Sequence, residues 1–127
     1  NCICDANAYS QCFLVEYGDF SMLLTGDVEA EGETMLIQEL MERDVGEVDL
    51  LKVAHHGSKN STKEELLHMI HPQIAVISCG EDNSYGHPHE ELLERLWMTG
   101  CRIYQTPDAG AVTVTVNGGK MKVRCFK

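Results

Sequence analysis

Long apolar segments are missing from this sequence of 127 residues. None of its hydrophobic runs approaches the roughly 20 consecutive apolar residues that a membrane-spanning helix needs. Proline is scarce, with 3 residues, whereas hydrophobic residues make up 43% of the chain, which is more than a disordered protein carries. The sequence therefore predicts a single globular domain that buries one core.

Positive charge is the second scarcity. Lys and Arg together number 10, against 20 for Asp and Glu, and the formal net charge is −10. A field of this sign repels polyanions instead of steering them towards the protein. We therefore expect a nucleic acid to bind only at a local site, through metal.

Paired C-x-x-C spacings are absent, although the chain has 6 cysteines. Cys2 and Cys4 do not by themselves predict a metal site, because no second pair accompanies them. The other cysteines in apolar, strand-like surroundings are expected to be buried free thiols, and these are Cys12, Cys79 and Cys125.

Strand-like and helix-like segments alternate along the chain. Short apolar or alternating runs predict strands at residues 10–17, 20–24, 48–54, 74–78, 102–105, 111–116 and 121–126. Helical spacing of apolar residues predicts helices at residues 33–43, between Ser61 and Pro72, and from Pro88 to Gly100. This alternation indicates an α/β fold with a mixed sheet and about three helices.

Local patterns also predict how the helices begin and which faces they bury. Ser61 and Glu64 have the S-x-x-E form of a capping box, in which the two residues satisfy free amide groups at a helix start. The apolar faces are expected to contain Met35, Leu36, Leu40 and Met41 in the first helix and Leu92, Leu93, Leu96 and Trp97 in the third.

Polar residues follow three of the predicted strands. Asp27 follows the strand at residues 20–24, and the pair His55 and His56 follows the strand at residues 48–54. His87 lies in the loop after the strand at residues 74–78. Because α/β sheets place their chemistry where strands end, we expect these side chains to converge. The alternative that they only cap turns stays open, since Asp and His are common in turns.

Carboxylate oxygen and imidazole nitrogen are ligands that suit Zn²⁺ or Mn²⁺, and one aspartate can bridge two ions. Two ions would clamp the attacking and leaving oxygens of a phosphodiester hydrolysis. Adjacent side chains of an extended segment point to opposite faces, so we expect one of His55 and His56 to bind metal and the other to contact substrate. His68, His71 and His89 are expected to be surface or helix-end residues.

Three segments together resemble the metallo-β-lactamase-fold domain of ComEC-type competence proteins, the DNA-uptake channels of bacterial transformation. They are Leu-Leu-Thr-Gly-Asp at residues 23–27, Leu-Lys-Val-Ala-His-His-Gly-Ser at 51–58 and Asn-Ser-Tyr-Gly-His-Pro at 83–88. Each segment is a weak signal by itself, whereas the set in this order is specific. The resemblance implies that the chain has part of an αββα sandwich.

The resemblance also implies roles for the strand-end residues. Asp27 corresponds to the metal ligand that bridges two ions, and His56 to the last ligand of the same dinuclear site. His55 then corresponds to the residue that contacts the scissile phosphate or protonates a leaving group. His87 lines the same pocket.

The sequence departs from the family in its first ligands. The family's H-x-[HD]-x-D-H segment does not occur, and Asn-Ala-Tyr-Ser at residues 7–10 stands where many relatives supply a further histidine. Residues 1–127, which begin without an initiator methionine, are therefore expected to be the C-terminal half of the domain. Such a half-domain is expected to bind metal weakly or not at all and to be inactive. Its uncovered sheet is expected to favour a homodimer.

The leading hypothesis is a metal-dependent phosphodiesterase or nuclease that acts on single-stranded DNA. The resemblance places it in one bacterial polypeptide with a membrane channel, on the extracytoplasmic side of the cytoplasmic membrane. Two alternatives stay open, because this fold hosts many activities. One is a non-catalytic scaffold or interaction module, and the other is a hydrolase of a phosphorylcholine ester or lactone.

Overall fold

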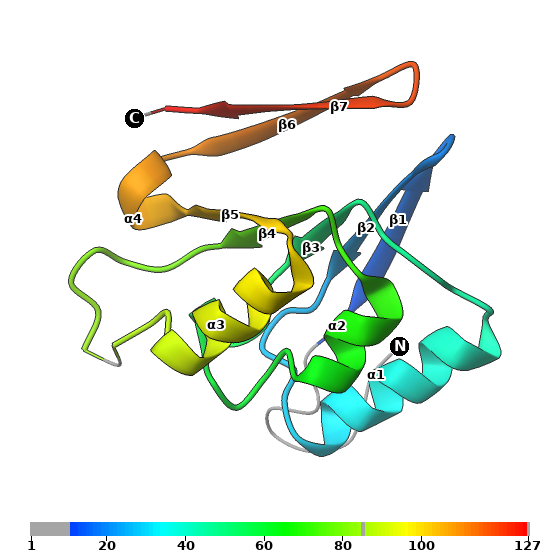
Figure 1. Ribbon diagram of the computed structural model, residues 1–127, viewed down its shortest axis with the longest axis horizontal. Helices are drawn as coiled ribbons and strands as arrows, with labels where there is room; N and C mark the ends of the chain where they lie inside the picture. Colours follow the sequence, from blue (N-terminus) through cyan, green and yellow to red (C-terminus); the bar gives the residue numbers. More distant parts are fainter. Residues whose placement is uncertain (1–10, 85, 127) are drawn as a thin grey trace.

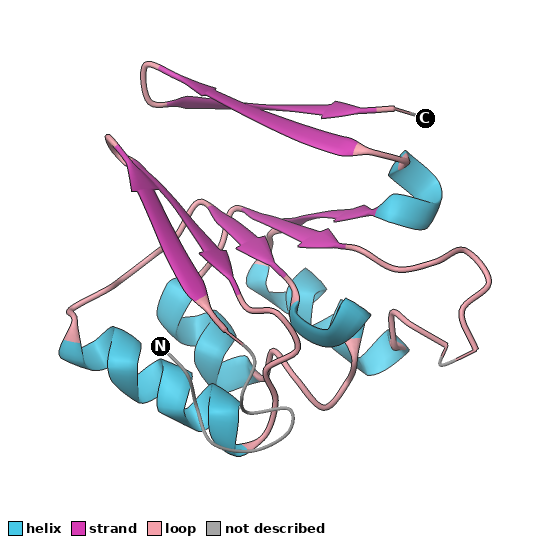
Figure 2. Ribbon diagram, turned by 180° about the vertical axis from the view of Figure 1, so that it is seen from behind, coloured by secondary structure: helices cyan, strands magenta, loops and turns pink. Residues whose placement is uncertain are grey.

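A computed structural model describes residues 11–84 and 86–126 of the chain. It contains a five-stranded sheet with helices on one face and a β-hairpin on the other (Figures 1 and 2). The predicted α/β class, with a mixed sheet and three helices of seven residues or more, is confirmed. The predictions for Cys2, Cys4 and residues 7–10 fall outside the described residues.

The main sheet keeps the order of the chain. Its strands are β1 (Phe13–Tyr17), β2 (Phe20–Leu24), β3 (Leu50–Lys52), β4 (Ile74–Ile77) and β5 (Arg102–Gln105). The predicted hairpin of β1 and β2 is confirmed, and β2, β3, β4 and β5 run parallel to one another. The C-terminal ends of these four strands therefore lie along one edge of the sheet. β3 ends earlier than predicted, because the chain turns into the 3₁₀ segment η1 (Ala54–Gly57).

The helices pack against one face of this sheet (Figure 2). They are α1 (Glu31–Glu42), α2 (Glu64–Ile70) and α3 (Glu90–Thr99), and a single turn, α4 (Thr106–Ala109), which the sequence did not predict, follows β5. The core between helices and sheet contains Leu23, Leu51, Ala75 and Ile77 from strands and Leu36, Ile37, Leu40, Leu66, Leu67, Ile70, Leu92 and Leu96 from helices. Burial of this apolar surface stabilises the packing of the helices on the sheet.

Several predicted helix residues lie outside the core. Met35, Met41 and Trp97 are 46%, 66% and 78% exposed, so their inward orientation was predicted wrongly. In α1 the buried face instead includes Ile37, which the predicted stripe left out. Pro88 is not the first residue of α3, because the helix begins at Glu90. The face that each of these helices buries therefore differs from the face predicted from the spacing of apolar residues.

A hairpin of β6 (Val112–Asn117) and β7 (Lys120–Cys125) packs on the opposite face of the main sheet (Figure 1). Its inward residues Val114, Val116, Met121 and Val123 join a second core around Phe20, Leu50 and Ile74. Thr113 and Thr115 are exposed, as predicted. The chain thus forms three layers, with the main sheet in the middle.

The cysteines are less buried than predicted. Cys125 is exposed at the end of β7, while Cys12 and Cys79 are partly buried. Burial raises the pKa of Cys12 to about 11, and it also raises the pKa of Cys79. Among the described cysteines, all four are free thiols, and the prediction of burial is wrong for Cys125.

A buried carboxylate of α1, and not a capping box, satisfies the amide groups before α2. Glu33 is 4% exposed, and its carboxylate accepts hydrogen bonds from the backbone N–H groups of Thr62 and Lys63, the latter at 2.8 Å. Burial raises the pKa of Glu33, although the two amide hydrogen bonds act in the opposite direction. The side chain of Ser61 instead donates to backbone carbonyls, so the predicted capping box with Glu64 is wrong.

Arg95 of α3 holds the same loop from the other side. Its guanidinium donates to the backbone carbonyls of Lys59, Ser61 and Thr62 at 2.8, 3.0 and 3.2 Å. The loop between η1 and α2 is therefore fixed to α1 through its amides and to α3 through its carbonyls. Because this loop follows the two histidines directly, it fixes the far end of the turn that carries them.

Replacing Glu33 with glutamine removes half of this anchoring. The amide side chain keeps one acceptor oxygen and places an N–H₂ group against a backbone N–H, so one buried donor loses its partner. We expect the free energy of unfolding, measured by urea denaturation, to fall by about 1–3 kcal/mol. Glu42→Gln, an exposed change on the same helix, is the control and is expected to stay within about 0.5 kcal/mol.

Candidate functional site

The structure brings the ends of neighbouring parallel strands together at one edge of the sheet. Asp27 follows β2, the pair His55 and His56 follows β3, and His87 follows β4. The backbone N–H of His55 donates to the carbonyl of Gly26 at 2.9 Å, which joins the loops after β2 and β3. The segments that follow β4 and β5 also leave the sheet on the same side (Figure 1).

Four imidazole rings form a cluster at this edge. The ring of His87 lies 5.7 Å from that of His55 and 6.3 Å from that of His56, measured between centroids. His89 lies at the start of α3, as predicted, but its ring is 4.7 Å from His87 and so belongs to the cluster. Desolvation by burial, followed by the charges of the three neighbouring histidines, lowers the pKa of His87. This ring is therefore neutral near pH 7.

A tight backbone turn aims both histidines of the pair into the cluster. His55 has φ 50° and ψ 45°, His56 has φ 54° and ψ 24°, and Gly57 has φ 87°. The histidines are thus in the left-handed region, so the premise that they lie on an extended segment is wrong. Left-handed non-glycine residues cost of order 1–3 kcal/mol each, and such strain gathers at functional sites.

Hydrogen bonds orient the rings of the pair. His56 Nδ1 lies 2.6 Å from the carbonyl oxygen of Ser78, which can only accept, so Nδ1 donates. His55 Nδ1 lies 2.9 Å from a carboxylate oxygen of Glu29 and donates in the same way. Both rings are therefore oriented through Nδ1, and Nε2 takes no part in these two bonds. Proteins orient metal-binding histidines through carbonyl and carboxylate partners of this kind.

Asp27 is exposed beside a partly buried lysine. Burial lowers the pKa of Lys52, and the negative charge of Asp27 acts in the opposite direction. Lys52 Nζ donates to the carbonyl of Val53 at 3.1 Å, and the buried hydroxyl of Thr25 donates to the carbonyl of Lys52 at 2.6 Å. Thr25 thereby holds the end of β2 against β3 and positions the Gly26-Asp27 turn.

The loop after β4 is closed by its own side chains. Asn83 accepts from the backbone N–H of His87 and donates to the His87 carbonyl, both at 2.7 Å. The hydroxyl of Thr106 contacts the backbone of Cys79, and the N–H of His89 donates to the Gly57 carbonyl at 2.9 Å. These bonds hold His87 over the histidine pair. Sequence reasoning missed the role of Asn83, although it begins the Asn-Ser-Tyr-Gly-His motif.

The donor atoms of this site only partly fit a metal ion. The Asp27 carboxylate and the His56 imidazole are ligands that Zn²⁺ and Mn²⁺ accept. Within residues 11–84 and 86–126, however, no group of three or more His, Cys, Asp or Glu side chains is arranged to hold an ion. The described part of the chain therefore supplies an incomplete set of ligands.

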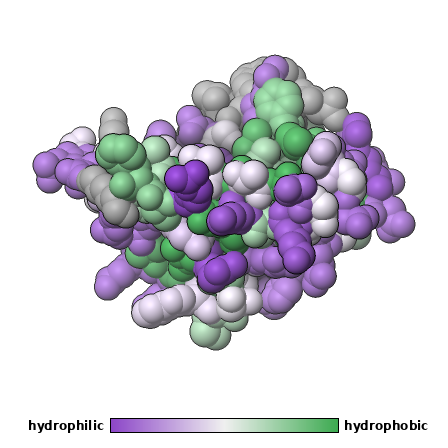
Figure 3. Space-filling view, turned by 90° about the horizontal axis from the view of Figure 1, so that it is seen from above, coloured by the Kyte–Doolittle hydropathy of each residue, from purple (hydrophilic) through white to green (hydrophobic). Residues whose placement is uncertain are grey.

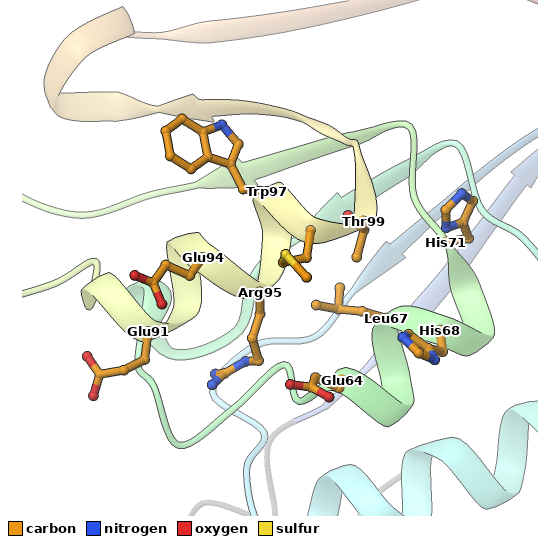
Figure 4. Close-up of a pocket in the computed structure, with 10 residues that line it drawn as sticks. Glu64, Leu67, His68, His71, Glu91, Glu94, Arg95, Trp97 and Thr99 are labelled. Carbon is orange, nitrogen blue, oxygen red and sulfur yellow. The ribbon is translucent and has the colours of Figure 1, made fainter.

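A separate cavity of about 890 Å³ lies between α2 and α3 (Figure 4). It is lined by His68, His71 and Trp97 among others, and Asp27 and the four clustered histidines are not part of its wall. His68 and His71 are exposed on the helical side of the molecule, as predicted. This cavity is thus distinct from the strand-end site.

Replacing Gly57 with alanine is expected to disrupt the cluster. A Cβ atom at this position would lie 2.6 Å from Pro88 Cβ and 3.2 Å from Ile77 Cγ2, and φ is 87°. The loop that carries His87 must therefore move, and we expect the free energy of unfolding to fall by about 2 kcal/mol or more. Urea denaturation measures the loss, and the imidazole NMR resonances report the displacement of His87.

The control for this variant is Gly80→Ala in the same loop, where a Cβ atom would meet nothing within 4 Å. It is expected to leave both the stability and the imidazole resonances close to those of the unchanged chain. If Gly57→Ala behaved like Gly80→Ala, the close packing of η1 against the loop would not be what positions His87.

Comparison with known proteins gives matches over most of the chain. The family model for the metallo-beta-lactamase superfamily matches residues 6–81, which is more than half of the sequence. Recombination protein 2 of Haemophilus influenzae is 37% identical over 118 residues, which cover 93% of this chain and 14% of that protein. ComE operon protein 3 of Bacillus subtilis is 41% identical over 107 residues, or 84% of this chain and 13% of that protein.

Competence protein ComA of Neisseria gonorrhoeae is 31% identical over 120 residues, which cover 94% of this chain and 17% of that protein. The chain thus spans less than a fifth of the length of each of these three relatives. The resemblance carried by the sequence motifs is confirmed by these matches. The chain therefore belongs to the metallo-β-lactamase superfamily.

Proposed function

We propose that the chain is the C-terminal part of a metal-dependent hydrolase domain that cleaves phosphodiester bonds of single-stranded DNA during DNA uptake. The observation that carries the proposal is the orientation of His55 and His56 through their Nδ1 atoms at the strand ends beside Asp27. Membership of the superfamily supports hydrolysis, and the name of the relative Competence protein ComA supports a role in competence.

In this proposal Asp27 and His56 are metal ligands, and the remaining ligands come from residues N-terminal to the chain. Bound Zn²⁺ or Mn²⁺ supplies a water of low pKa and polarises a phosphoryl oxygen. The Ser78 carbonyl fixes the tautomer of His56, so that Nε2 carries the lone pair a ligand needs. Without the other ligands the site is weak, and we expect the chain by itself to be inactive.

His55 and His87 act on the substrate in the same proposal. His55 is held at Nδ1 by Glu29, and in the protonated ring Nε2 carries the N–H that contacts the scissile phosphate or protonates the leaving oxygen. His87, fixed by Asn83 over the histidine pair, lines the pocket as a neutral donor or acceptor. The rigid sheet edge keeps both rings in place while the open side admits a polymer.

The surroundings of the domain are part of the proposal. No helix in the described residues is long and apolar enough to cross a membrane. We place a membrane channel in another part of the same bacterial polypeptide, with this domain on the extracytoplasmic side, which fits the much greater length of the relatives. A homodimer of the chain by itself is supported by the sheet edge at β1, where Phe13 and Tyr17 are 52% and 66% exposed.

Replacing Asp27 with asparagine tests the proposed metal site. The polypeptide is produced with the upstream residues that its gene encodes, and cleavage of single-stranded DNA is measured with Mn²⁺ or Zn²⁺. We expect cleavage to fall by at least about 100-fold, because a ligand matters more than the outer-shell groups whose loss costs 10–100-fold. Asp19→Asn, in the exposed turn between β1 and β2, is the matched control and should retain full activity.

Three outcomes contradict parts of this proposal. If the extended protein neither took up metal nor cleaved DNA, the result would favour the non-catalytic scaffold. If the extended protein hydrolysed a simple phosphodiester or a lactone but left DNA intact, the result would favour the alternative of a hydrolase with another substrate. Cleavage by the chain alone that Asp27→Asn abolishes would show that the ligand set is complete without upstream residues.

His55→Gln separates the substrate-contacting role from metal binding. We expect kcat to fall by about 10²–10⁴-fold, the usual contribution of a general acid, while the metal content measured by mass spectrometry stays unchanged. His68→Gln, an exposed histidine of α2, is the control and should change neither quantity. Loss of metal together with activity would instead make His55 a ligand.

A further inference from the structure

The positive charge of this acidic protein is concentrated at its C-terminal end. After Asp108 the sequence contains no Asp or Glu, yet it holds four of the 10 Lys and Arg residues. Three of the four, Lys120, Lys122 and Arg124, lie on β7 within the described residues. The rest of the chain is therefore even more acidic than its formal net charge of −10 indicates.

The hairpin places these three cations on one face. Side chains alternate along a strand, and in β7 Met121 and Val123 pack against the main sheet while Lys120, Lys122 and Arg124 are exposed. We call these three residues the basic strip. Their register partners on β6 are the polar residues Asn117, Thr115 and Thr113. Figure 3 views this side of the molecule, and hydrophilic residues, drawn in purple, lie across it.

Among the described residues, Lys120, Lys122 and Arg124 take part in no ion pair. An aromatic side chain continues the row, because Phe126 is 84% exposed and its N–H donates to the Ala111 carbonyl at 2.9 Å, which prolongs the ladder. By alternation, Phe126 lies on the same face as the strip.

The strip leads towards the histidine cluster. β5 ends at the edge that carries the candidate site, α4 follows it, and β6 begins there. Because β7 is antiparallel to β6 and Cys125 pairs with Val112, the Arg124 end of the strip lies on the site side of the molecule. Figure 1 shows the end of β7, α4 and the loop after β4 on that same side.

We propose that the outer face of the β6–β7 hairpin, with the basic strip and Phe126, binds the backbone and a base of single-stranded DNA. The inference rests on the proposed function, for which it names the surface that guides the substrate to the site. Cations at every second strand position are about 6.6 Å apart, so the strip offers a row about 13 Å long to a linear polyanion. Successive phosphates pair with such a row, and an exposed aromatic ring stacks on any base.

The acidic remainder of the surface favours this placement over non-specific adsorption. A polyanion is repelled by the helical face, where acids dominate, and is attracted along the hairpin. The charge of the strip is also complementary to a folded acidic protein. A row of cations that ends in an aromatic side chain, however, matches a strand of nucleotides more closely.

The test measures binding without metal, so that it is independent of cleavage. Fluorescence anisotropy of a labelled 20-nucleotide oligothymidine is followed as the chain is titrated, at several NaCl concentrations. We expect Lys122→Gln with Arg124→Gln to weaken binding about tenfold at low salt and to reduce the slope of log K against log salt by about 1.4. Phe126→Ala is expected to weaken binding about tenfold with the slope unchanged.

The matched control is Arg43→Gln with Lys63→Gln, which removes one Arg and one Lys from the helical side. It is expected to leave both the affinity and the slope unchanged. An equal loss in the control would reduce the effect to net charge and overturn the proposal. Absence of binding by the unchanged chain at low salt would also overturn it.

The basic strip could instead bind a second, acidic copy of the chain. Sedimentation velocity at low salt tests this alternative. Self-association that the Lys122→Gln, Arg124→Gln pair abolishes, with no DNA binding, would assign the strip to that copy and overturn the proposal. Failure of the proposed function looks different, because DNA would still bind to the hairpin while the upstream-extended protein cleaved none.

Discussion

Parallel pairing of β2, β3, β4 and β5 is the constraint on which the candidate site depends. Parallel strands must all end at the same edge, so the topology alone brings the loops after three neighbouring strands together, and hydrogen bonds between the loops then fix their positions. Asp27, His55, His56 and His87 are separated by up to sixty residues along the chain, yet each lies in the segment that follows one of three neighbouring strands. The core under the sheet keeps that edge rigid, and the loops can therefore be polar and open.

Two tertiary anchors convert this edge into a defined arrangement. The turn at His55, His56 and Gly57 is held on one side by packing against Pro88 and on the other by the loop that Glu33 and Arg95 fix to α1 and α3. The strain of two left-handed histidines is offset by these contacts. The position of the imidazole rings therefore depends on α1, α3 and the loop after β4 together.

Charge is divided between the layers of the molecule. Acidic residues cover the helices and the loops, while the hairpin on the opposite face of the sheet carries cations and no acid. The partition is electrostatic and costs the fold little, since exposed charges several residues apart repel weakly in water. The two faces therefore differ in the sign of their charge, and the histidine cluster lies at the edge of the sheet between them.

Hydrophobic period and turn residues in the sequence determined the α/β class, the order of strands and helices, the hairpins and the placement of Asp27 and the histidines at strand ends. The motif set was enough to identify the family. The sequence did not determine the left-handed turn at His55 and His56, the capping of α2 by Glu33, the membership of His89 in the cluster or the exposure of Trp97. Local sequence patterns reflect the conformations that neighbouring residues prefer. These features arise instead from contacts between residues about thirty positions apart, or from which helix face packs against the core. Only the tertiary structure determines them.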